Sequence, residues 1–247
     1  MFRQRNTENS INNDVERTIM KIVYAGDSTC AQYNISKFPQ TGIGQGLELY
    51  IKPEVKIYNY AIGGRSTKSF IDEGRLLKIE ADIGKGDFLF IQFGHNDEKE
   101  YDRNRYTTPF GTYKENLRKF IKVARKSGAI PVLITPVERR HFVDACKLDE
   151  STHTDYVAGM KQIAEEEQVA LIDLCTKSRV KMEEAGAVET TKWFMHLAKG
   201  EYPAFPEGKV DNTHLKPEGA RIFAGLIAEG LKELGGVYAE LLVEEFC

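Results

Sequence analysis

Four short polar clusters contain the residues of this sequence that are best suited to chemistry. They are Gly26-Asp27-Ser28-Thr29, Gly63-Gly64-Arg65-Ser66, Gly94-His95-Asn96-Asp97 and Asp211-Asn212-Thr213-His214. Ser28 offers a hydroxyl nucleophile, His214 a base for its proton, and Asp211 a carboxylate that can orient the base. The N–H groups of Ser28 and Gly64 and the side-chain amide of Asn96 can donate to a developing oxyanion. These residue types predict acyl transfer through a covalent intermediate.

Each cluster has a simpler explanation when it is taken alone. A serine after a strand is a common helix N-cap, and a Gly-Gly pair is a common turn. Asn and Asp in loops often hydrogen-bond their own backbone. The occurrence of all four clusters in one chain, three of them at successive strand ends, favours the chemical interpretation.

Short apolar runs and helical patterns alternate along the chain. The runs span residues 22–25, 55–61, 88–93, 130–135 and 169–174, and they are typical of buried parallel strands. Helical patterns occupy 46–51, 66–81, 112–126 and 151–168, and a last helix begins at Pro217 and continues through Leu231. The alternation predicts an α/β fold, a three-layer α/β/α sandwich around a five-stranded parallel sheet. The polar clusters then meet at the carboxyl edge of that sheet.

The length, composition and charge of the chain limit the domain organisation and the partners that can be expected. The chain has 247 residues, 41% of them hydrophobic, and a net charge of −3. We expect a flexible polar arm over 1–19 and a single domain over 20–247. A charge near zero argues against nucleic acid as a partner. No apolar stretch is long enough for a membrane span, and the first twenty residues lack the apolar core of a signal peptide, which predicts a cytoplasmic protein without membrane association.

The four cysteines predict free thiols. Cys30, Cys146, Cys175 and Cys247 are far apart and form no C-x-x-C pair. This spacing is typical of neither a zinc site nor a disulfide scaffold, and it fits a reducing compartment. The sequence leaves the oligomeric state open.

The four clusters resemble the four sequence blocks of the SGNH, or GDSL-like, hydrolases. Longer strings resemble the rhamnogalacturonan acetylesterase branch of that superfamily. These strings are Gly-Gly-Arg-Ser at 63–66, Phe-Gly-His-Asn-Asp at 93–97, Thr-Pro-Val at 135–137 with Arg139 and Arg140, Gly-Glu-Tyr-Pro at 200–203, and Asp-Asn-Thr-His-Leu at 211–215. The resemblance covers about residues 21–231. Thr29 departs from the leucine usual in the superfamily, although threonine is common in the acetylesterase branch.

The resemblance implies a fold, an activity and a set of site residues. It implies the flavodoxin-like SGNH fold, with Ser28, Asp211 and His214 as the catalytic triad and with Ser28, Gly64 and Asn96 as the oxyanion hole. It implies a serine esterase that removes O-acetyl groups from acetylated oligosaccharides derived from rhamnogalacturonan or pectin, without metal or cofactor. Because no signal peptide is recognised, it points to members that act on imported oligosaccharides.

Five further side chains are candidates for substrate binding. They are Arg65, Arg139, Arg140, Trp193 and Tyr202. The arginines could pair with uronate carboxylates, and ordinary ion-paired arginines explain them equally well. The two aromatic residues, near Phe194, could form a wall on which sugars stack or could belong to the core. The histidines His141 and His153 are expected to be structural.

Two other functions remain open at this point. His95, Asp97, Asp211 and His214 are also metal-ligand types, which would suit a metal-dependent phosphoesterase. That chemistry needs more carboxylates at strand ends, whereas the first strand here ends in Gly-Asp-Ser. A non-catalytic saccharide-binding module on the same fold should lack a triad or oxyanion member, and none is missing. The Gly-x-Gly-x-Gly run at 42–46 lacks the spacing of a dinucleotide cradle.

Overall fold

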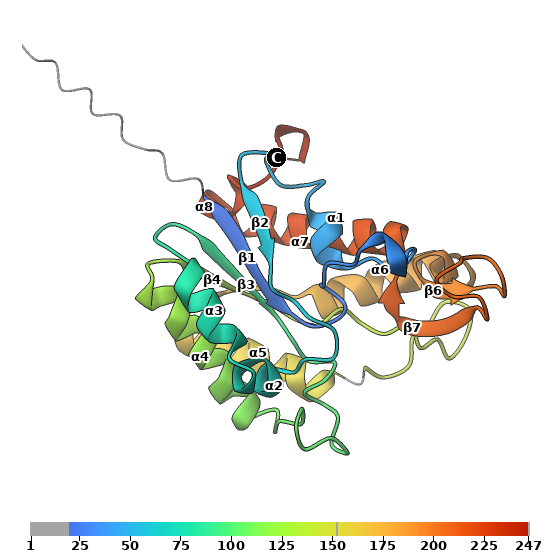
Figure 1. Cartoon of the computed structure of the whole chain (residues 1–247), viewed down its shortest axis with the longest axis horizontal. Helices are drawn as coiled ribbons and strands as arrows, with labels where there is room; N and C mark the ends of the chain where they lie inside the picture. The colour runs from blue at the N-terminus through green and yellow to red at the C-terminus, as the bar shows by residue number, and fades with distance from the viewer. Residues whose placement is uncertain (1–19, 152, 247) are drawn as a thin grey trace, which may run out of the picture.

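A five-stranded parallel sheet forms the centre of the molecule (Figure 1). The computed structural model describes residues 20–151 and 153–246, so the predicted arm over 1–19 lies outside the described residues. The strands are β1 (Lys21–Gly26), β2 (Lys56–Asn59), β3 (Phe88–Gln92), β4 (Ile130–Ile134) and β5 (Ala170–Ile172). They lie in the order β2-β1-β3-β4-β5, and every neighbouring pair is parallel. The predicted sheet is confirmed.

Strand β1 shows why these segments are apolar throughout. Ile22 and Tyr24 belong to the hydrophobic cluster on one face of the sheet, and Val23 and Ala25 belong to the cluster on the other face. Successive side chains of a strand point to opposite faces, so a strand that is covered on both sides needs apolar residues at every position.

Helices cover both faces of the sheet, which confirms the three-layer sandwich. One face carries α2 (Thr67–Asp72), α3 (Arg75–Asp82), α4 (Thr112–Lys126) and α5 (Thr154–Glu167). The other carries α1 (Ile43–Leu47), α6 (Leu174–Glu189), α7 (Pro217–Leu234) and α8 (Gly236–Ala239). Short 3-10 turns occupy Ile35–Lys37, Thr190–Lys192 and Glu244–Phe246. The helix predicted over 112–126 has these same bounds in the structure.

Two helix predictions need correction. The single helix predicted over 66–81 is two helices, α2 and α3, because Gly74 between them has a left-handed φ of 69° that interrupts the helical backbone. The helix predicted over 46–51 is α1, which begins earlier, at Ile43, and ends at Leu47.

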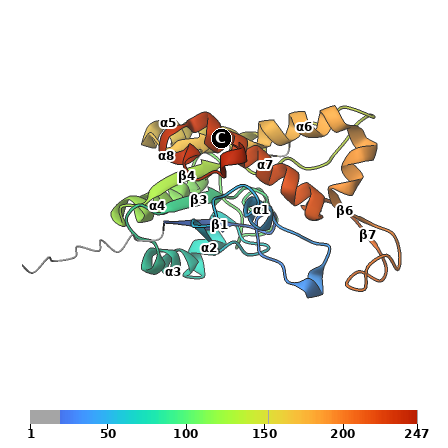
Figure 2. The same ribbon diagram turned by 90° about the horizontal axis from the view of Figure 1, so that it is seen from above.

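The sequence patterns missed α6 and a small antiparallel sheet. Strands β6 (Phe194–Leu197) and β7 (Lys209–Leu215) pair with each other outside the central sheet. Figures 1 and 2 both place them at one end of the molecule. The buried positions of α6 include Cys175, Ser178 and Gly186, which weaken its apolar pattern, and β7 has a largely polar sequence.

Helices α1 and α7 approach closely enough to require glycine. A Cβ at Gly46 would lie 2.5 Å from the carbonyl oxygen of Ala220 in α7. Helix α1 follows the loop that contains Ser28, and α7 follows His214. This helix contact therefore fixes the Ser28 loop relative to strand β7, which carries His214.

We predict that Gly46→Ala lowers the free energy of unfolding by about 1–3 kcal/mol, because the added methyl group collides with backbone that cannot rotate away. Gly84→Ala is the matched control, since its Cβ would have no neighbour nearer than 3.7 Å. It should stay within about 0.5 kcal/mol of wild type. Urea unfolding of the three proteins measures both effects, and equal stability of the two variants would contradict the helix-contact argument.

Candidate active site

The polar clusters meet where the strand order reverses. In the order β2-β1-β3, the chain leaves β1 toward β2 on one side and reaches β3 on the other, which is the position where open α/β sheets bind ligands. Ser28 follows β1, Gly64 follows β2 and Asn96 follows β3. A Cβ at Gly63 would lie 3.6 Å from the Cβ of Ser28, so the first two loops are in contact.

Ser28, His214 and Asp211 form a continuous hydrogen-bonded chain. The Nε2 atom of His214 lies 2.9 Å from the Oγ of Ser28, and its Nδ1 atom lies 2.7 Å from the Oδ2 of Asp211. The other carboxylate oxygen accepts the N–H groups of Thr213 and His214 at 2.8 and 2.9 Å. With a proton on Nδ1 facing the carboxylate, Nε2 is free to accept the serine proton.

The environment of Asp211 keeps it ionised. Burial alone favours the protonated carboxyl, but the hydrogen bond and charge of His214 and the Lys209 ammonium, 2.8 Å away, outweigh burial and hold the pKa of Asp211 well below its usual range. The carboxylate is thus a permanent acceptor for the imidazole N–H.

The loop that carries Ser28 is held on both sides of the nucleophile. The buried carboxylate of Asp27 accepts the N–H and hydroxyl of Thr29 at 2.9 and 2.8 Å and contacts His95 Nδ1 at 3.2 Å. Burial favours protonation of Asp27, but His95 and Thr29 prevail and lower its pKa. The hydroxyl of Tyr33 donates to the carbonyl oxygen of Ser28 at 2.8 Å.

Three donors are available for an oxyanion. Within the described residues, the backbone N–H groups of Ser28 and Gly64 have no acceptor. Gly64 has a φ of 79°, a backbone conformation that residues other than glycine rarely adopt. The Nδ2 atom of Asn96 donates one hydrogen to the carbonyl oxygen of Arg65 at 3.1 Å, which leaves its second hydrogen free. This arrangement suits the stabilisation of a tetrahedral intermediate.

Arg139 and Arg140 are partly exposed but make polar contacts within the protein, so the role in substrate binding stays a prediction for them. Arg139 pairs with Glu98 at 2.6 Å and donates to the hydroxyl of Thr213 at 2.7 Å. Arg140 donates to the Thr190 hydroxyl at 2.9 Å, to Asn212 at 3.3 Å and to the carbonyl oxygen of Ala187. Both arginines therefore support strand β7, which carries Asp211 and His214.

The other candidate substrate residues divide into two groups. Trp193 is 4% exposed and packs against Phe223 with ring centroids 6.0 Å apart, so it belongs to the core and offers no face to a sugar. Arg65 and Tyr202 stay partly exposed. Arg65 pairs with Glu73 at 3.1 Å, and the ring of Tyr202 contacts that of Phe38 at 5.7 Å.

Glu98 is a residue of the site that the sequence patterns did not single out. Its second carboxylate oxygen lies 2.7 Å from Nδ1 of buried His153, whose ring is 4.5 Å from that of His95. The expected structural role of His153 agrees with this burial, whereas His141 is exposed. Glu98 lies two residues after Asn96, and this closeness was the available signal.

The side chains that suggested a metal site have other partners. Asp97 is fully buried and accepts the N–H of Thr67 at 3.1 Å and the hydroxyls of Thr67 and Thr107 at 2.5 and 3.0 Å. Over the described ranges, no group of three or more histidine, cysteine or acidic side chains is arranged to hold a metal ion.

The family comparison agrees with this geometry. The family model described as GDSL-like Lipase/Acylhydrolase matches residues 22–227. The chain belongs to that family. The GDSL-like family consists of ester hydrolases, so the predicted class, carboxylic ester hydrolase, is confirmed.

Curated relatives and solved structures within the GDSL-like group are similar over most of the chain. Rhamnogalacturonan acetylesterase RhgT of Bacillus subtilis is 40% identical over 87% of this chain and 91% of its own length. The probable rhamnogalacturonan acetylesterase YesY of the same organism is 42% identical over 91% and 98%. The crystal structure of a Bacillus subtilis protein, YxiM, superposes with a TM-score of 0.71 at 27% identity, over 88% of this chain and 57% of that one.

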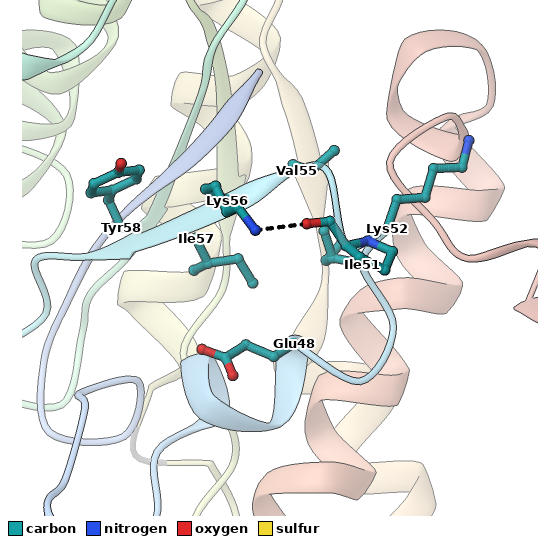
Figure 3. Close-up of a pocket in the computed structure, with 8 residues that line it drawn as sticks. Glu48, Ile51, Lys52, Val55, Lys56, Ile57 and Tyr58 are labelled. Carbon is teal, nitrogen blue, oxygen red and sulfur yellow. Dashed lines mark hydrogen bonds between the residues drawn. The ribbon is translucent and has the colours of Figure 1, made fainter. Parts of the chain in front are cut away.

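A hollow beside strand β2 is separate from this GDSL-like site (Figure 3). It is lined by Glu48, Ile51, Lys52, Pro53, Val55, Lys56, Ile57 and Tyr58. The Lys56 ammonium donates to the carbonyl oxygen of Pro53 at 2.9 Å and so stabilises the turn into β2. None of the predicted site residues lines this hollow.

Among the helices that the structure describes, none has the length and apolar character of a membrane span.

We predict that Asp97 makes stability depend on pH. Burial raises the pKa of Asp97 to about 7, against about 4 in an unfolded chain. Between these values the folded state holds a proton that the unfolded state has lost, so the free energy of unfolding should fall as pH rises from 4 to 7, by at most about 4 kcal/mol. Asp97→Asn should remove this part of the slope. Urea unfolding of both proteins from pH 5 to 8 tests it, and equal slopes would contradict the assignment.

Proposed function

We propose that this protein is a serine carbohydrate esterase that removes O-acetyl groups from acetylated, pectin-derived oligosaccharides. The observation that carries the proposal is the chain of contacts from Ser28 through His214 to Asp211, beside three free donors. The 40–42% identity to rhamnogalacturonan acetylesterases supports the substrate class. Family membership favours this function over the metal-dependent phosphoesterase.

In the first half of the proposed reaction, the Oγ of Ser28 attacks the acetyl carbonyl carbon. His214 Nε2 takes the serine proton, and Asp211 stabilises the imidazolium that forms. The carbonyl oxygen becomes an oxyanion, which accepts from the N–H groups of Ser28 and Gly64 and from the Asn96 amide. When the intermediate collapses, the bond to the sugar oxygen breaks, and His214 returns the proton to that oxygen.

In the second half, water releases the acetyl group. His214 takes a proton from the water as its oxygen attacks the acetyl carbon, and the same three donors hold the second oxyanion. Collapse breaks the bond to Ser28 Oγ, which regains the proton from His214, and acetate leaves. These steps need no cofactor.

Arg65 and Tyr202 are the substrate contacts that we propose. Both are partly exposed, and Arg65 lies next to the proposed donor Gly64. A guanidinium at this position suits a uronate carboxylate, and a tyrosine ring suits the face of a sugar. We further propose one domain over residues 20–247, since both hydrophobic clusters share the central sheet. The cytoplasmic location stays a prediction.

Ser28→Ala should fold normally and lose esterase activity, because no acyl-enzyme can form without the hydroxyl. Loss of a nucleophile in such a triad costs on the order of 10⁶ in kcat. A fluorophosphonate should add mass to the peptide that contains Ser28. Ser36→Ala, at an exposed serine, is the control and should keep full activity and labelling. Retention of more than a few per cent of activity by Ser28→Ala would show that another residue is the nucleophile.

Substrate preference should follow acyl length and sugar charge. Aryl acetate should react far faster than aryl butyrate, because each misfitting methylene costs roughly 1–3 kcal/mol in a small pocket. Acetylated galacturonate-containing oligosaccharides should react faster than neutral acetylated xylo-oligosaccharides. The difference should shrink in high salt and in Arg65→Ala. Faster release of acetate from the xylo-oligosaccharides, unchanged in Arg65→Ala, would keep the acetylesterase and exclude the pectic substrate.

A further inference from the structure

Two cations contact the side-chain oxygen of Asn96. Lys99 Nζ lies 2.8 Å from Oδ1, and Arg105 Nη1 lies 3.4 Å from the same atom. On the other side of the amide, Nδ2 donates to the carbonyl oxygen of Arg65 at 3.1 Å. Asn96 itself is 3% exposed. The amide is thus fixed at both of its ends.

The orientation of this amide decides whether it can stabilise an oxyanion. Ammonium and guanidinium groups only donate hydrogen bonds, so Lys99 and Arg105 require the amide oxygen to face them. The NH₂ group must then point the other way, where one hydrogen is held by Arg65 and the second is free. A flipped amide would place its NH₂ against two cations and its oxygen against the developing negative charge, and both contacts are repulsive.

We propose that Lys99 and Arg105 are positioning residues of the oxyanion hole, which lock the Asn96 amide with its donor toward the reacting carbonyl. This inference rests on the proposed function. The cations also polarise the amide, because their charge draws electron density toward Oδ1 and makes the N–H groups stronger donors.

The surroundings of the two cations fit this role. Arg105 pairs with Asp102 at 2.5 Å, and its Nη1 would lie 3.7 Å from a Cβ at Gly64, so it is near a second proposed donor. Lys99 is half-buried, and no carboxylate of the described residues lies within 4.0 Å of its ammonium. Among the described residues, the Asn96 oxygen is the one acceptor to which this ammonium donates a hydrogen bond.

The charges around Lys99 come from several elements. Burial, followed by the charges of Arg105 and Arg139, lowers the pKa of Lys99, while Asp27 and Glu98 act in the opposite direction. A half-buried cation in this setting has lost part of its solvation, which strengthens its preference for the amide oxygen.

The first test is the kcat and KM of Lys99→Met with aryl acetate. Loss of one oxyanion donor costs about 10² to 10³ in kcat, and Arg105 still holds part of the orientation, so we expect a loss of about tenfold in kcat with little change in KM. Lys99→Arg, which restores a cation, should recover most of the activity. The double variant Lys99→Met, Arg105→Met should approach the loss of about 10² to 10³ in kcat that we expect for Asn96→Ala.

The chain offers a matched control. Lys119 donates to the Oδ1 of Asn116, three residues earlier, at 3.0 Å, so it repeats the contact of Lys99 with Asn96 on helix α4. Lys119→Met removes the same kind of bond outside the proposed oxyanion hole. Its kcat should equal that of wild type.

A double-mutant cycle separates positioning from direct substrate binding. In an Asn96→Ala background, Lys99→Met should cause no further loss of kcat, because the amide on which it acts is gone. The same tenfold loss in that background, or an unchanged kcat of Lys99→Met in the wild-type background, would overturn the inference and leave the proposed function standing. Full activity of both Ser28→Ala and Asn96→Ala would overturn the two together.

Discussion

The contact between His214 Nε2 and Ser28 Oγ joins two residues that are 186 positions apart, and the rest of the site depends on it. The central sheet positions the serine, and the outlying β6–β7 pair positions the histidine. Thr41, after the serine loop, donates to the carbonyl oxygen of Leu215 at 2.9 Å, and α1 packs against α7 through Gly46. These backbone contacts keep Ser28 Oγ and His214 Nε2 within hydrogen-bond distance of each other. Proton transfer between the two side chains requires that distance.

The carboxylates of the site are similar in chemistry but differ in their partners. Asp211 has an imidazole and an ammonium beside it and stays ionised, whereas Asp97 has only hydroxyl and backbone donors and holds its proton to a much higher pH. Glu98 faces an arginine and a histidine and has a lowered pKa despite its burial. The surroundings of each carboxyl group therefore set its pKa, as in other enzymes that place several carboxylates close together.

The sequence predicted the central sheet and the identity of the four clusters, because apolar runs and the residues after them are local features. Prediction from the sequence failed where the role of a residue depends on a contact with a residue far away in the chain. The sequence could not show the protein partners of the arginines at 139 and 140, because Glu98, Thr190 and Asn212 come from distant parts of the chain. Trp193 was ambiguous until Phe223 covered it. Helix α6 escaped detection because serine, cysteine and glycine occupy three of its five buried positions, and β7 because it pairs outside the central sheet.

The placement of His214 on β7 also has a consequence for biosynthesis. The ribosome makes the sheet, the serine loop and the oxyanion loop before it reaches residue 209, where β7 begins. A nascent chain at that stage holds a serine without a base, and such a hydroxyl is no more nucleophilic than any other serine. The triad is complete only when about the last sixth of the polypeptide, from residue 209 onward, has been made and β7 has docked, so a chain interrupted before that point cannot hydrolyse esters.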